Sequence, residues 1–452
     1  MKRKLLYGIL FAVLAANLLV GTQLFLRVSQ AGEADDPYSN LKLFTTVMER
    51  IRSEYVDSSK ISYKDLVHAA LKGMLNTLDP HSEFMDQTKY QHLKHDTSGE
   101  FGGVGIVVSM KDEFLTVVSP MEDTPGFKAG ILTGDRIIKI EGRATDHISL
   151  PDAVKLLRGE PGTDVNLSIL RPSNGQMKDY KLTRAAIKVD TVKDFSGHRQ
   201  FPLGENHVGY VRLTQFGERT SDEFSSALKT LKEKGMKSLV LDLRGNPGGL
   251  LDQAVEVCER FLPRGELVVT TEGREEKAKS EYRARGGDKY GSLPVVILVN
   301  GGSASASEIV SGCLQDSTAR GLCRTIILGE QTFGKGSVQS ILQLQDGSAL
   351  RLTTAKYYTP SHKVIHERGI TPDIVVPMTA EEEQDAYLKR TPGGLESLSV
   401  KDRERVMNAK DVQLDRALDL LKGLTAYTSS NPLPEPGTRS TTPKVVRQKE
   451  LP

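Results

Sequence analysis

The 452-residue sequence predicts an α/β core, a smaller and mainly β domain inserted before it, and helices at both ends. Two patterns carry this prediction. From residue 208 on, short apolar strands alternate with amphipathic helices, which favours a mainly parallel sheet with helices on its faces. Between residues 99 and 183, short β-branched strands are separated by Gly, Pro and Asp turns, which is typical of a β domain.

The chain begins with a segment typical of protein export. Met1-Lys-Arg-Lys4 precedes an uncharged, mostly apolar stretch at 5–26. We expect residues 1–30 to be a signal peptide or a membrane anchor, because the stretch is long enough to span a bilayer while Ser29-Gln-Ala31 offers a cleavage site. Positive charge is greater before the stretch than after it. The body is therefore expected in the periplasm or at the outer face of the cytoplasmic membrane.

The N-terminal region at 31–96 is expected to be helical. Apolar residues follow helical spacing at 40–55 and again at 64–78. Asp79-Pro-His-Ser82 then reads as a turn that stops the second helix, so we assign His81 a structural role and no chemistry.

A second helical region is expected at 381–428, after the core. Its clearest helix covers 411–424, where Leu414, Leu418 and Leu421 follow helical spacing. The tail at 429–452 is rich in Ser, Thr and Pro and is expected to be disordered.

Charge and cysteine content exclude several classes of function. Sixty basic and 58 acidic residues nearly cancel, and basic clusters lack interleaved aromatics, so no nucleic-acid partner is expected. Neither a metal nor a cofactor is expected, since the cysteines lack metal-type spacing. Cys258, Cys313 and Cys323 are expected to be buried thiols, with a bridge between the last two as the alternative.

The order of elements within the core follows from the same patterns. A helix at 221–235, capped by Ser221 or Thr220, is followed by a strand at 237–243. A strand at 267–271 precedes a polar stretch at 272–291 that looks like a mobile loop. Further on, Asp346-Gly347 is the expected turn of a β-hairpin.

The chemically most informative stretch follows the apolar strand at 295–299. Glycines and serines lead from it into a helix, so a tight turn places serines at a helix N-terminus. Unpaired N–H groups and the helix dipole there would stabilise an oxyanion. A competing interpretation is that Ser305-Ala-Ser-Glu308 is only a capping box, and spacing does not choose among Ser303, Ser305 and Ser307.

Lys335 stands between two glycines and is a candidate general base. A lysine can accept a proton only when neutral, which requires burial or nearby positive charge. A phosphate-binding loop is the alternative, because Gly329-x4-Gly334-Lys335 nearly matches that pattern. However, Gly336 stands where Ser or Thr would bind magnesium, and a strand-like rather than a helix-like segment follows.

These two stretches together resemble the carboxyl-terminal processing peptidases, a family of tail-specific proteases with a Ser-Lys pair. The matching motifs are Ser-Ala-Ser-Ala-Ser-Glu308 and Thr-Phe-Gly-Lys-Gly-Ser-Val-Gln339. The resemblance implies that Ser305 is the nucleophile, Lys335 the base and Gln339 the residue that orients the lysine. It also implies a core at 186–380 with an architecture like that of ClpP and the crotonases.

The same resemblance places an oxyanion hole beside Ser305. In the family, the stretch that matches Asp242-Leu-Arg-Gly-Asn-Pro-Gly-Gly249 lines the active site. By this analogy Gly248 or Gly249 supplies one N–H group and Ala306 supplies the other. The connection after Asp316 is longer than usual in the family, which leaves open where the preceding helix ends and whether Cys323 is buried.

The region at 97–185 resembles a PDZ domain, most clearly through Ala129-Gly-Ile-x-x-Gly-Asp-x-Ile-x-x-Ile-x-Gly142. A PDZ domain binds a terminal carboxylate on the backbone of a glycine-rich loop and accepts the peptide by β-augmentation. The residues expected to bind the peptide are Gly102, Gly103, Val104, Gly105 and Ile106. Arg158, at the end of the groove helix, matches a basic residue that couples binding to activation in some family members.

Taken together, the sequence predicts an exported serine endopeptidase that binds protein C-terminal tails through its PDZ domain and cleaves by a Ser-Lys acyl-enzyme mechanism. The alternative is a catalytically silent PDZ binding or scaffold protein of the same fold. An acyl-CoA enzyme is disfavoured because it would leave the PDZ region and the Ser-Lys pair without a role. The expected partners are protein or peptide C-termini; an adaptor protein and a homodimer are left open.

Overall fold

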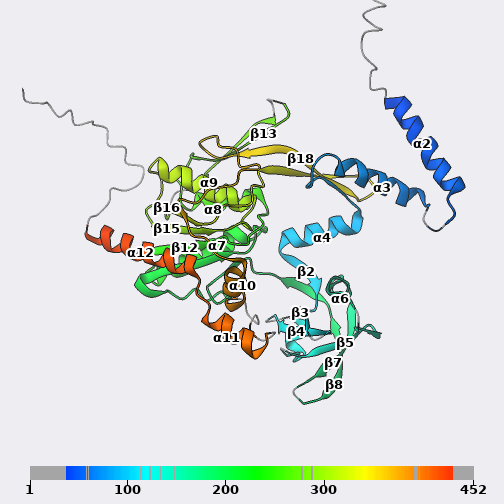
Figure 1. Cartoon of the computed structure of the whole chain (residues 1–452), viewed down its shortest axis with the longest axis horizontal. Helices are drawn as coiled ribbons and strands as arrows, with labels where there is room; N and C mark the ends of the chain where they lie inside the picture. The colour runs from blue at the N-terminus through cyan, green and yellow to red at the C-terminus, as the bar shows by residue number, and fades with distance from the viewer. Residues whose placement is uncertain are drawn as a thin grey trace, which may run out of the picture. The chain divides into compact units, whose positions relative to one another are not determined.

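A computed structural model of the chain describes residues 37–430 except 58, 60, 112, 122–123, 133, 147, 173, 276–277, 287–288, 391–394 and 396–397. The predicted signal or anchor segment at 1–30 and most of the predicted tail lie outside the described residues. Within the described part, no helix combines the length and apolar character needed to span a membrane. The chain divides after Leu78 into two compact units, and each is described by itself (Figure 1).

The first unit contains the two N-terminal helices that the sequence predicts, α2 (Pro37–Glu54) and α3 (Tyr63–Asn76). Ser62 caps α3, because its Oγ accepts the N–H of Asp65 over 3.1 Å. Helix α2 buries none of its residues, so its apolar face, including Leu41, Val47 and Ile51, is exposed.

The second unit opens with the predicted turn at 79–82, strand β1 (Glu83–Met85) and helix α4 (Gln87–Ser98). A β domain follows, in which β2 (Glu100–Gly103) pairs with β9 (Ala185–Lys188). Its main sheet has the order β3-β4-β5-β7-β8, and β3 lies at the edge. The strands are β3 (Ile106–Lys111), β4 (Phe114–Pro120), β5 (Arg136–Ile140), β7 (Asp164–Arg171) and β8 (Gln176–Thr183), and β6 (Arg143–Ala144) pairs with β5.

Two helices complete this β domain, α5 (Pro125–Lys128) and α6 (Leu150–Leu157). Along β7 the side chains alternate between buried and solvent-facing, and the buried ones, Val165, Leu167 and Ile169, form the core with strands β4 and β5. This alternation is the pattern of a sheet with one covered face.

The core of the second unit is a six-stranded sheet in the order β10-β11-β12-β15-β16-β19. All neighbours except β10 and β11 pair in parallel, as the alternating pattern predicts. The strands are β10 (Val192–Lys193), β11 (Val208–Leu213), β12 (Ser238–Asp242), β15 (Val295–Val299), β16 (Thr325–Gly329) and β19 (Ile374–Val375). A short 3-10 helix at Glu205–His207 precedes β11.

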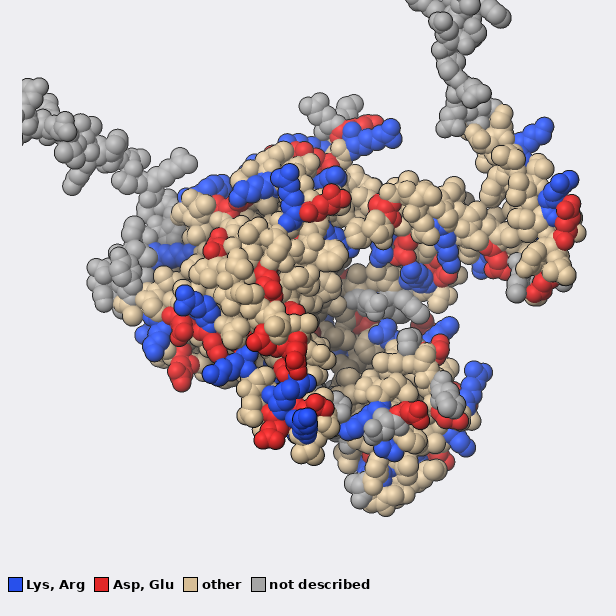
Figure 2. Space-filling view, viewed as in Figure 1, with Lys and Arg blue, Asp and Glu red and all other residues tan. Residues whose placement is uncertain are grey.

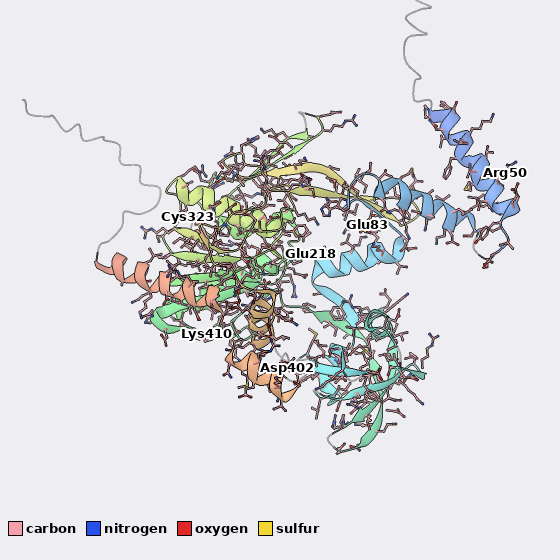
Figure 3. The ribbon with its side chains drawn as sticks, viewed as in Figure 1. Arg50, Glu83, Glu218, Cys323, Asp402 and Lys410 are labelled. Atoms are coloured by element: carbon pink, nitrogen blue, oxygen red, sulfur yellow. The ribbon has the colours of Figure 1, made fainter. Side chains whose placement is uncertain are left out.

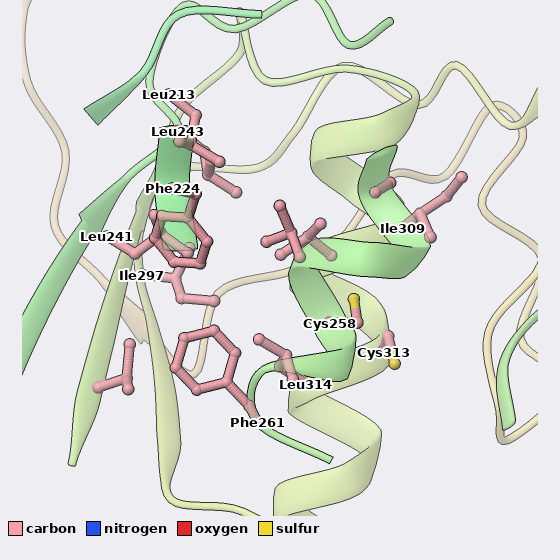
Figure 4. Close-up of a cluster of buried hydrophobic side chains, with 14 of the residues drawn as sticks. Leu213, Phe224, Leu241, Leu243, Cys258, Phe261, Ile297, Ile309, Cys313 and Leu314 are labelled. Atoms are coloured by element: carbon pink, nitrogen blue, oxygen red, sulfur yellow. The ribbon is translucent and has the colours of Figure 1, made fainter. Parts of the chain in front are cut away.

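Helices cover both faces of this sheet. On one face lie α7 (Thr220–Glu233), α8 (Leu251–Glu259) and α9 (Ala306–Ala319), whose apolar side chains pack with the sheet into the main cluster (Figure 4). On the other face α12 (Val412–Ser430) packs Leu414, Ala417 and Leu421 against β12, β15 and β16. Strand β15 is fully buried over its whole length, which explains its continuous apolar run.

A second sheet carries the strand that follows Lys335. Its order is β1-β18-β13-β14, and β17 pairs with β18 as the predicted hairpin around Asp346-Gly347. The strands are β13 (Leu267–Gly273), β14 (Ser280–Arg283), β17 (Ser337–Gln343) and β18 (Ala349–Tyr358). Helices α10 (Ala380–Lys389) and α11 (Val400–Asn408) precede α12. On the face seen in Figure 2, acidic and basic side chains are interspersed.

Three local expectations are wrong. Neither Ser221 nor Thr220 is the N-cap of α7; Arg219 is, because Thr220 Oγ1 instead accepts the N–H of Gly217 over 2.9 Å. The stretch at 272–291 is in part a strand, since β14 pairs with β13. Helix α12 continues to Ser430, so residues 429–430 are helical rather than part of a disordered tail.

The cysteines are buried free thiols, as expected. Cys258 and Cys313 face each other's helices in the main cluster (Figure 4), and Cys323, which is labelled in Figure 3, is buried as well. The structure therefore contains no bridge between Cys313 and Cys323. Helix α9 ends at Ala319, and Gly321, with a φ of 74°, turns the chain toward β16.

Candidate active site

Ser305 lies where strand β15 gives way to helix α9, at the carboxyl end of a central parallel strand. Its backbone has φ 54° and ψ −110°, which is a strained conformation for a residue with a Cβ. Such strain is common where a sharp strand-to-helix turn presents a nucleophile. The side chain is half-buried and therefore reachable.

The two neighbouring serines have structural partners instead. Ser303 is fully buried, and its Oγ donates to the carbonyl of Leu243 over 2.8 Å. Ser307 is also fully buried, and its Oγ donates to the carbonyl of Asn246 over 3.0 Å. Of the three serines that spacing left open, Ser305 alone in this run is accessible.

Glu308 joins the turn that carries Ser305 to the turn that carries Lys335, residues 332–336, which is called the lysine turn below. Its Oε2 accepts the backbone N–H of Ser305 over 2.8 Å and that of Lys335 over 2.9 Å. Its Oε1 accepts the N–H of Gly334 over 2.7 Å and the hydroxyl of Thr332 over 2.6 Å. The carboxyl group is fully buried, which raises its pKa, while these four hydrogen bonds act in the opposite direction.

The sequence showed Glu308 only as the acidic end of a capping box. The bond from the Ser305 N–H is the reciprocal half of such a box. The bonds to the lysine turn could not be read from local spacing, because they join segments that meet only in the folded chain.

Lys335 has the environment that a neutral lysine requires. Burial of its side chain, and next the positive charge of Arg351, lower its pKa, whereas Glu308 acts to raise it. Because its pKa is lowered, a larger fraction of Lys335 is neutral at a given pH than for a lysine in water, and the neutral amine can accept a proton. Arg351 was not singled out from the sequence; it is held in place by an ion pair with Glu83 of β1.

Gln339 lies on β17, next to a break in the strand register between Val338 and Gln339. Its Nε2 donates to Ser337 Oγ over 3.1 Å and to Thr353 Oγ1 over 2.9 Å. Its Oε1 is buried and, among the described residues, has no hydrogen-bond partner. The structure thus places Gln339 in the lysine hairpin but shows no bond from it to Lys335. Register breaks of this kind often re-aim side chains beside active sites.

The glycines of the loop at 243–249, called the glycine loop below, lie directly against Ser305. A Cβ on Gly248, whose φ is 98°, would come within 2.8 Å of Ser305 Cβ and 3.0 Å of the Ala306 nitrogen. The N–H of Gly248 donates to Asn246 Oδ1 over 2.9 Å. Within the described chain, the N–H groups of Gly249 and Ala306 have no partner, and Gly249 is exposed whereas Gly248 is buried.

The turn at 79–82 is hydrogen-bonded to β18, the strand that carries Arg351 and Thr353. Asp79 Oδ1 accepts the N–H groups of His81 and Ser82, each over 2.8 Å, and its Oδ2 accepts the hydroxyl of Ser82 over 2.7 Å. Burial acts to raise the pKa of Asp79, but these hydrogen bonds, with that of the Ser82 hydroxyl first, lower it to about 2. Ser82 Oγ accepts the N–H of Thr353 over 3.1 Å. The pKa of His81 is lowered by burial and then by the charge of Lys335. His81 therefore lies near the site, a placement that its turn motif did not reveal.

The expected peptide-binding residues are divided between a paired strand and an open loop. Gly102 and Gly103 belong to β2 and pair with Ala186 and Ala185. Val104 and Gly105 follow β2; their carbonyls accept N–H groups from Gly126 and Met121, each over 2.8 Å. In the described residues their own N–H groups have no backbone partner.

Ile106 begins the edge strand β3, next to the groove helix α6. Arg158 follows α6, with its guanidinium 4.5 Å from the ring centre of Phe101. Arg158 and Phe101 line a cavity of about 290 Å³, and residues of α4 line it as well. The structure thus brings Arg158 next to β2.

Comparison with known proteins places this architecture in a family. Residues 207–376 match Peptidase family S41, and residues 116–171 match the PDZ domain. The chain is 40% identical to a carboxy-terminal-processing protease of Bartonella bacilliformis, over 96% of this chain and 99% of that protein. It is 35% identical to the carboxy-terminal processing protease CtpA of Bacillus subtilis, over 83% of this chain and 78% of that protein.

Among solved structures, the photosystem II D1 C-terminal processing protease is 30% identical, with a TM-score of 0.43, over 74% of this chain and 92% of that one. The α/β core with its helices and the PDZ region before it agree with the matches along the sequence. The chain therefore belongs to the carboxy-terminal processing proteases of peptidase family S41, and is a serine-type endopeptidase with a PDZ domain.

Proposed function

We propose that this protein is an exported endopeptidase that binds protein C-terminal tails through its PDZ domain and cleaves them by a Ser-Lys acyl-enzyme mechanism. Ser305 is the nucleophile and Lys335 the general base. The single observation that carries this proposal is the common bond of both residues to Glu308, which fixes the nucleophile turn and the lysine turn on one carboxylate.

In the first half-reaction, the neutral amine of Lys335 accepts the proton of Ser305 as its Oγ attacks the scissile carbonyl. The tetrahedral intermediate expels the amine of the new N-terminus, which takes a proton from the Lys335 ammonium. In the second half-reaction a water molecule gives a proton to Lys335 and attacks the acyl ester. The bond from the acyl carbon to Ser305 Oγ breaks, the Lys335 ammonium returns the proton to Ser305 Oγ, and the acid leaves. The lowered pKa of Lys335 supports this role.

Gln339 orients the lysine in this proposal. Its Nε2 is held by Ser337 and Thr353, which fixes the amide plane and leaves the buried Oε1 as an acceptor. A buried acceptor without a partner is uncommon in proteins. An N–H of Lys335 is the donor that we assign to it.

The oxyanion is stabilised by the N–H groups of Ala306 and Gly249. Ala306 opens helix α9, where the N–H has no partner within the helix and the dipole favours negative charge. We prefer Gly249 to Gly248 because the Gly248 N–H is already bonded to Asn246, while Gly249 is exposed.

The PDZ domain, which we delimit at 97–185, holds the substrate tail. The N–H groups of Val104 and Gly105, which have no backbone partner among the described residues, offer a place for the terminal carboxylate, and β3 offers the edge for β-augmentation. Gly102 and Gly103 then act by allowing close packing; a Cβ on Gly102 would lie 2.0 Å from the carbonyl oxygen of Gly159. Arg158 is proposed to link this loop to the rest of the protein through its stacking on Phe101.

Export is proposed from residues 1–30 alone, and places the enzyme in the periplasm or at the outer face of the membrane. Expression of the full chain followed by N-terminal sequencing checks this point. A mature N-terminus near Ala31 shows a cleaved signal peptide, an intact N-terminus in the membrane fraction shows an anchor, and an intact protein in the cytosol contradicts export.

The function is tested with the chain from Glu33 onward and its Ser305→Ala and Lys335→Ala variants. Each is incubated with an unfolded model protein that ends in a free apolar carboxylate, and with the same protein amidated at its C-terminus. Fragments from the parent alone, and fewer with the amidated protein, are expected. Cleavage by Ser305→Ala at the parental rate would contradict the mechanism, and equal cleavage of both substrates would contradict tail recognition.

A further inference from the structure

Three buried charged side chains and a fourth, partly buried one lie together behind the glycine loop. Asp242 and Arg244 come from the end of β12 and the loop itself, whereas Arg390 ends α10 and Asp411 precedes α12. Asp242 is 0% exposed, Arg244 3% and Arg390 7%. The charges of Arg244 and Arg390 hold the pKa of Asp242 well below its ordinary value, although burial alone would raise it.

The geometry of this cluster is that of a closed ion network. Arg244 donates to both oxygens of Asp411, from Nη1 over 2.7 Å and from Nη2 over 2.8 Å, and from Nη2 to Asp242 over 2.7 Å. Arg390 Nη1 donates to Asp411 over 2.9 Å. Such two-pronged contacts between Arg and carboxylate fix geometry as well as charge.

A second contact joins the same C-terminal region to the nucleophile turn, residues 300–305. Glu383 of α10 accepts a hydrogen bond from Asn300 Nδ2. The other end of that amide is also used, because Asn300 Oδ1 accepts the N–H of Gly245 over 2.8 Å and that of Gly302 over 3.1 Å. Asn300 therefore bridges the glycine loop, the nucleophile turn and α10.

The two loops are also bonded to each other. The carbonyl of Asn246 accepts the N–H of Ala304 over 3.0 Å, next to the nucleophile, and the hydroxyl of Ser307. A shift of the glycine loop would therefore move the nucleophile turn with it. Gly248, Gly249 and Ser305 all lie on this bonded pair of loops.

We propose that the C-terminal helices hold the nucleophile and the oxyanion donors in register, with Asp411 and Glu383 as positioning residues that act through Arg244 and Asn300. This inference rests on the proposed roles of Ser305, Gly249 and Ala306. It gives a positioning role in catalysis to residues that follow 207–376, the part of the chain that matches the peptidase family. Lys410 and Asp402 mark this C-terminal region in Figure 3.

The physical reason is that a buried charge without its partner is costly. Without the Asp411 charge, Asp242 is the one carboxylate left in the cluster. The two buried guanidinium groups of Arg244 and Arg390 must then share it. Movement of the Arg244 side chain and the glycine loop toward solvent would then lower the free energy of this charge. A displacement of the reacting groups by about 1 Å can reduce a rate roughly a hundredfold.

The test uses Asp411→Asn and Glu383→Ala in the chain from Glu33 onward. Asparagine keeps the size and the cap acceptor that binds the Leu414 N–H, here 3.1 Å from Oδ1. It removes the charge and places an NH2 group where Oδ2 now accepts from Arg244 and Arg390. Arg405→Ala is the matched control, since Arg405 pairs with Asp385 over 2.9 Å between the same C-terminal helices but reaches neither loop. We measure kcat and KM for the unfolded model protein, the rate of Ser305 phosphonylation by a fluorophosphonate, and thermal unfolding.

Both variants are expected to lower kcat and the phosphonylation rate at least roughly tenfold with KM within about twofold, because the reacting groups rather than the PDZ groove are displaced. Arg405→Ala is expected to keep the parental kcat. Parental kcat and phosphonylation in Glu383→Ala and in folded Asp411→Asn would overturn the inference; if Asp411→Asn does not fold, Glu383→Ala decides alone. Ser305→Ala separates the two proposals, since its continued activity refutes the Ser-Lys mechanism and says nothing against a positioning role.

Discussion

The backbone N–H groups of Ser305 and Lys335 donate to the same atom, Oε2 of Glu308, over 2.8 and 2.9 Å. The two residues come from turns that are distant in sequence, after β15 and after β16 respectively. A buried carboxylate with four donors around it is an acceptor that no neutral side chain can fully replace. The separation of the Ser305 and Lys335 backbones is therefore set largely by the position of this one carboxylate.

Glu308→Gln is expected to disable the enzyme while leaving most of the fold in place. An amide offers one oxygen, so its NH2 group must face at least one of the N–H donors that the carboxylate now accepts. We expect a loss of at least about 2 kcal/mol in the free energy of unfolding, and a decrease of kcat by roughly a hundredfold. Urea unfolding and cleavage assays check this, with Glu330→Gln as a control of equal chemistry. Parental kcat in Glu308→Gln would show that the carboxylate does not set the geometry.

The activity is expected to rise with pH as Lys335 loses its proton, with a midpoint below the ordinary lysine value of 10.5. Arg351→Gln removes a positive charge that lowers the pKa of Lys335, so the midpoint should move to higher pH. Glu83→Gln breaks the ion pair of Arg351 without removing the arginine and should not raise the midpoint. The pH dependence of kcat/KM measures both effects. An unchanged or lower midpoint in Arg351→Gln would contradict this account.

The same shift affects stability in a predictable direction. The folded state binds the Lys335 proton more weakly than the unfolded chain, whose lysine has the ordinary pKa. The free energy of unfolding therefore rises with pH between the lowered pKa and 10.5, and this rise should be absent in Lys335→Met. Chemical unfolding of both proteins at several pH values in that window tests the sign.

The sequence predicted those parts of the molecule that repeat a local pattern. The buried strand at β15, the helix that starts beside Ser305 and the hairpin after Lys335 each have their own periodicity or turn residues. The contacts that complete the site follow no local pattern. They join segments that meet only when the whole sheet has folded: Glu308 with Lys335, Asn300 with Glu383, and Arg244 with Asp411.

Two local errors have the same physical origin. Thr220 has the right type and place for a helix cap, but its hydroxyl accepts the N–H of Gly217 in the preceding turn and contacts the hydroxyl of Thr191, which is distant in sequence. The polar residues at 280–283 resemble a loop because β14 is an edge strand with exposed side chains, and its pairing with β13 is not visible in composition.

Gly248→Ala is expected to abolish activity, because the added Cβ would lie 2.7 Å from the carbonyl oxygen of Ala304 and 2.8 Å from Ser305 Cβ. The residue also has a φ of 98°, which disfavours any side chain. Gly301→Ala is the matched control in the nucleophile turn, since nothing lies within 4 Å of its added Cβ. We expect Gly301→Ala to keep kcat within about twofold and Gly248→Ala to lose at least roughly a hundredfold. Comparable losses in both variants would mean that the turn tolerates no change at all, and that the contact with Ser305 is not the cause.

Leu421→Ala is expected to destabilise the peptidase core from the face opposite the nucleophile helix. Leu421 is fully buried between α12 and the sheet, next to Leu414 and Ala417. Truncation of such a side chain removes apolar contacts and leaves a cavity, which costs about 2–5 kcal/mol. Leu418 shares the predicted helical face, yet 37% of it is exposed, so Leu418→Ala should cost less than about 1 kcal/mol. Denaturant unfolding of the two variants separates them; equal losses would contradict the packing of α12, and a loss of kcat in folded Leu421→Ala would extend the influence of α12 to the active-site loops.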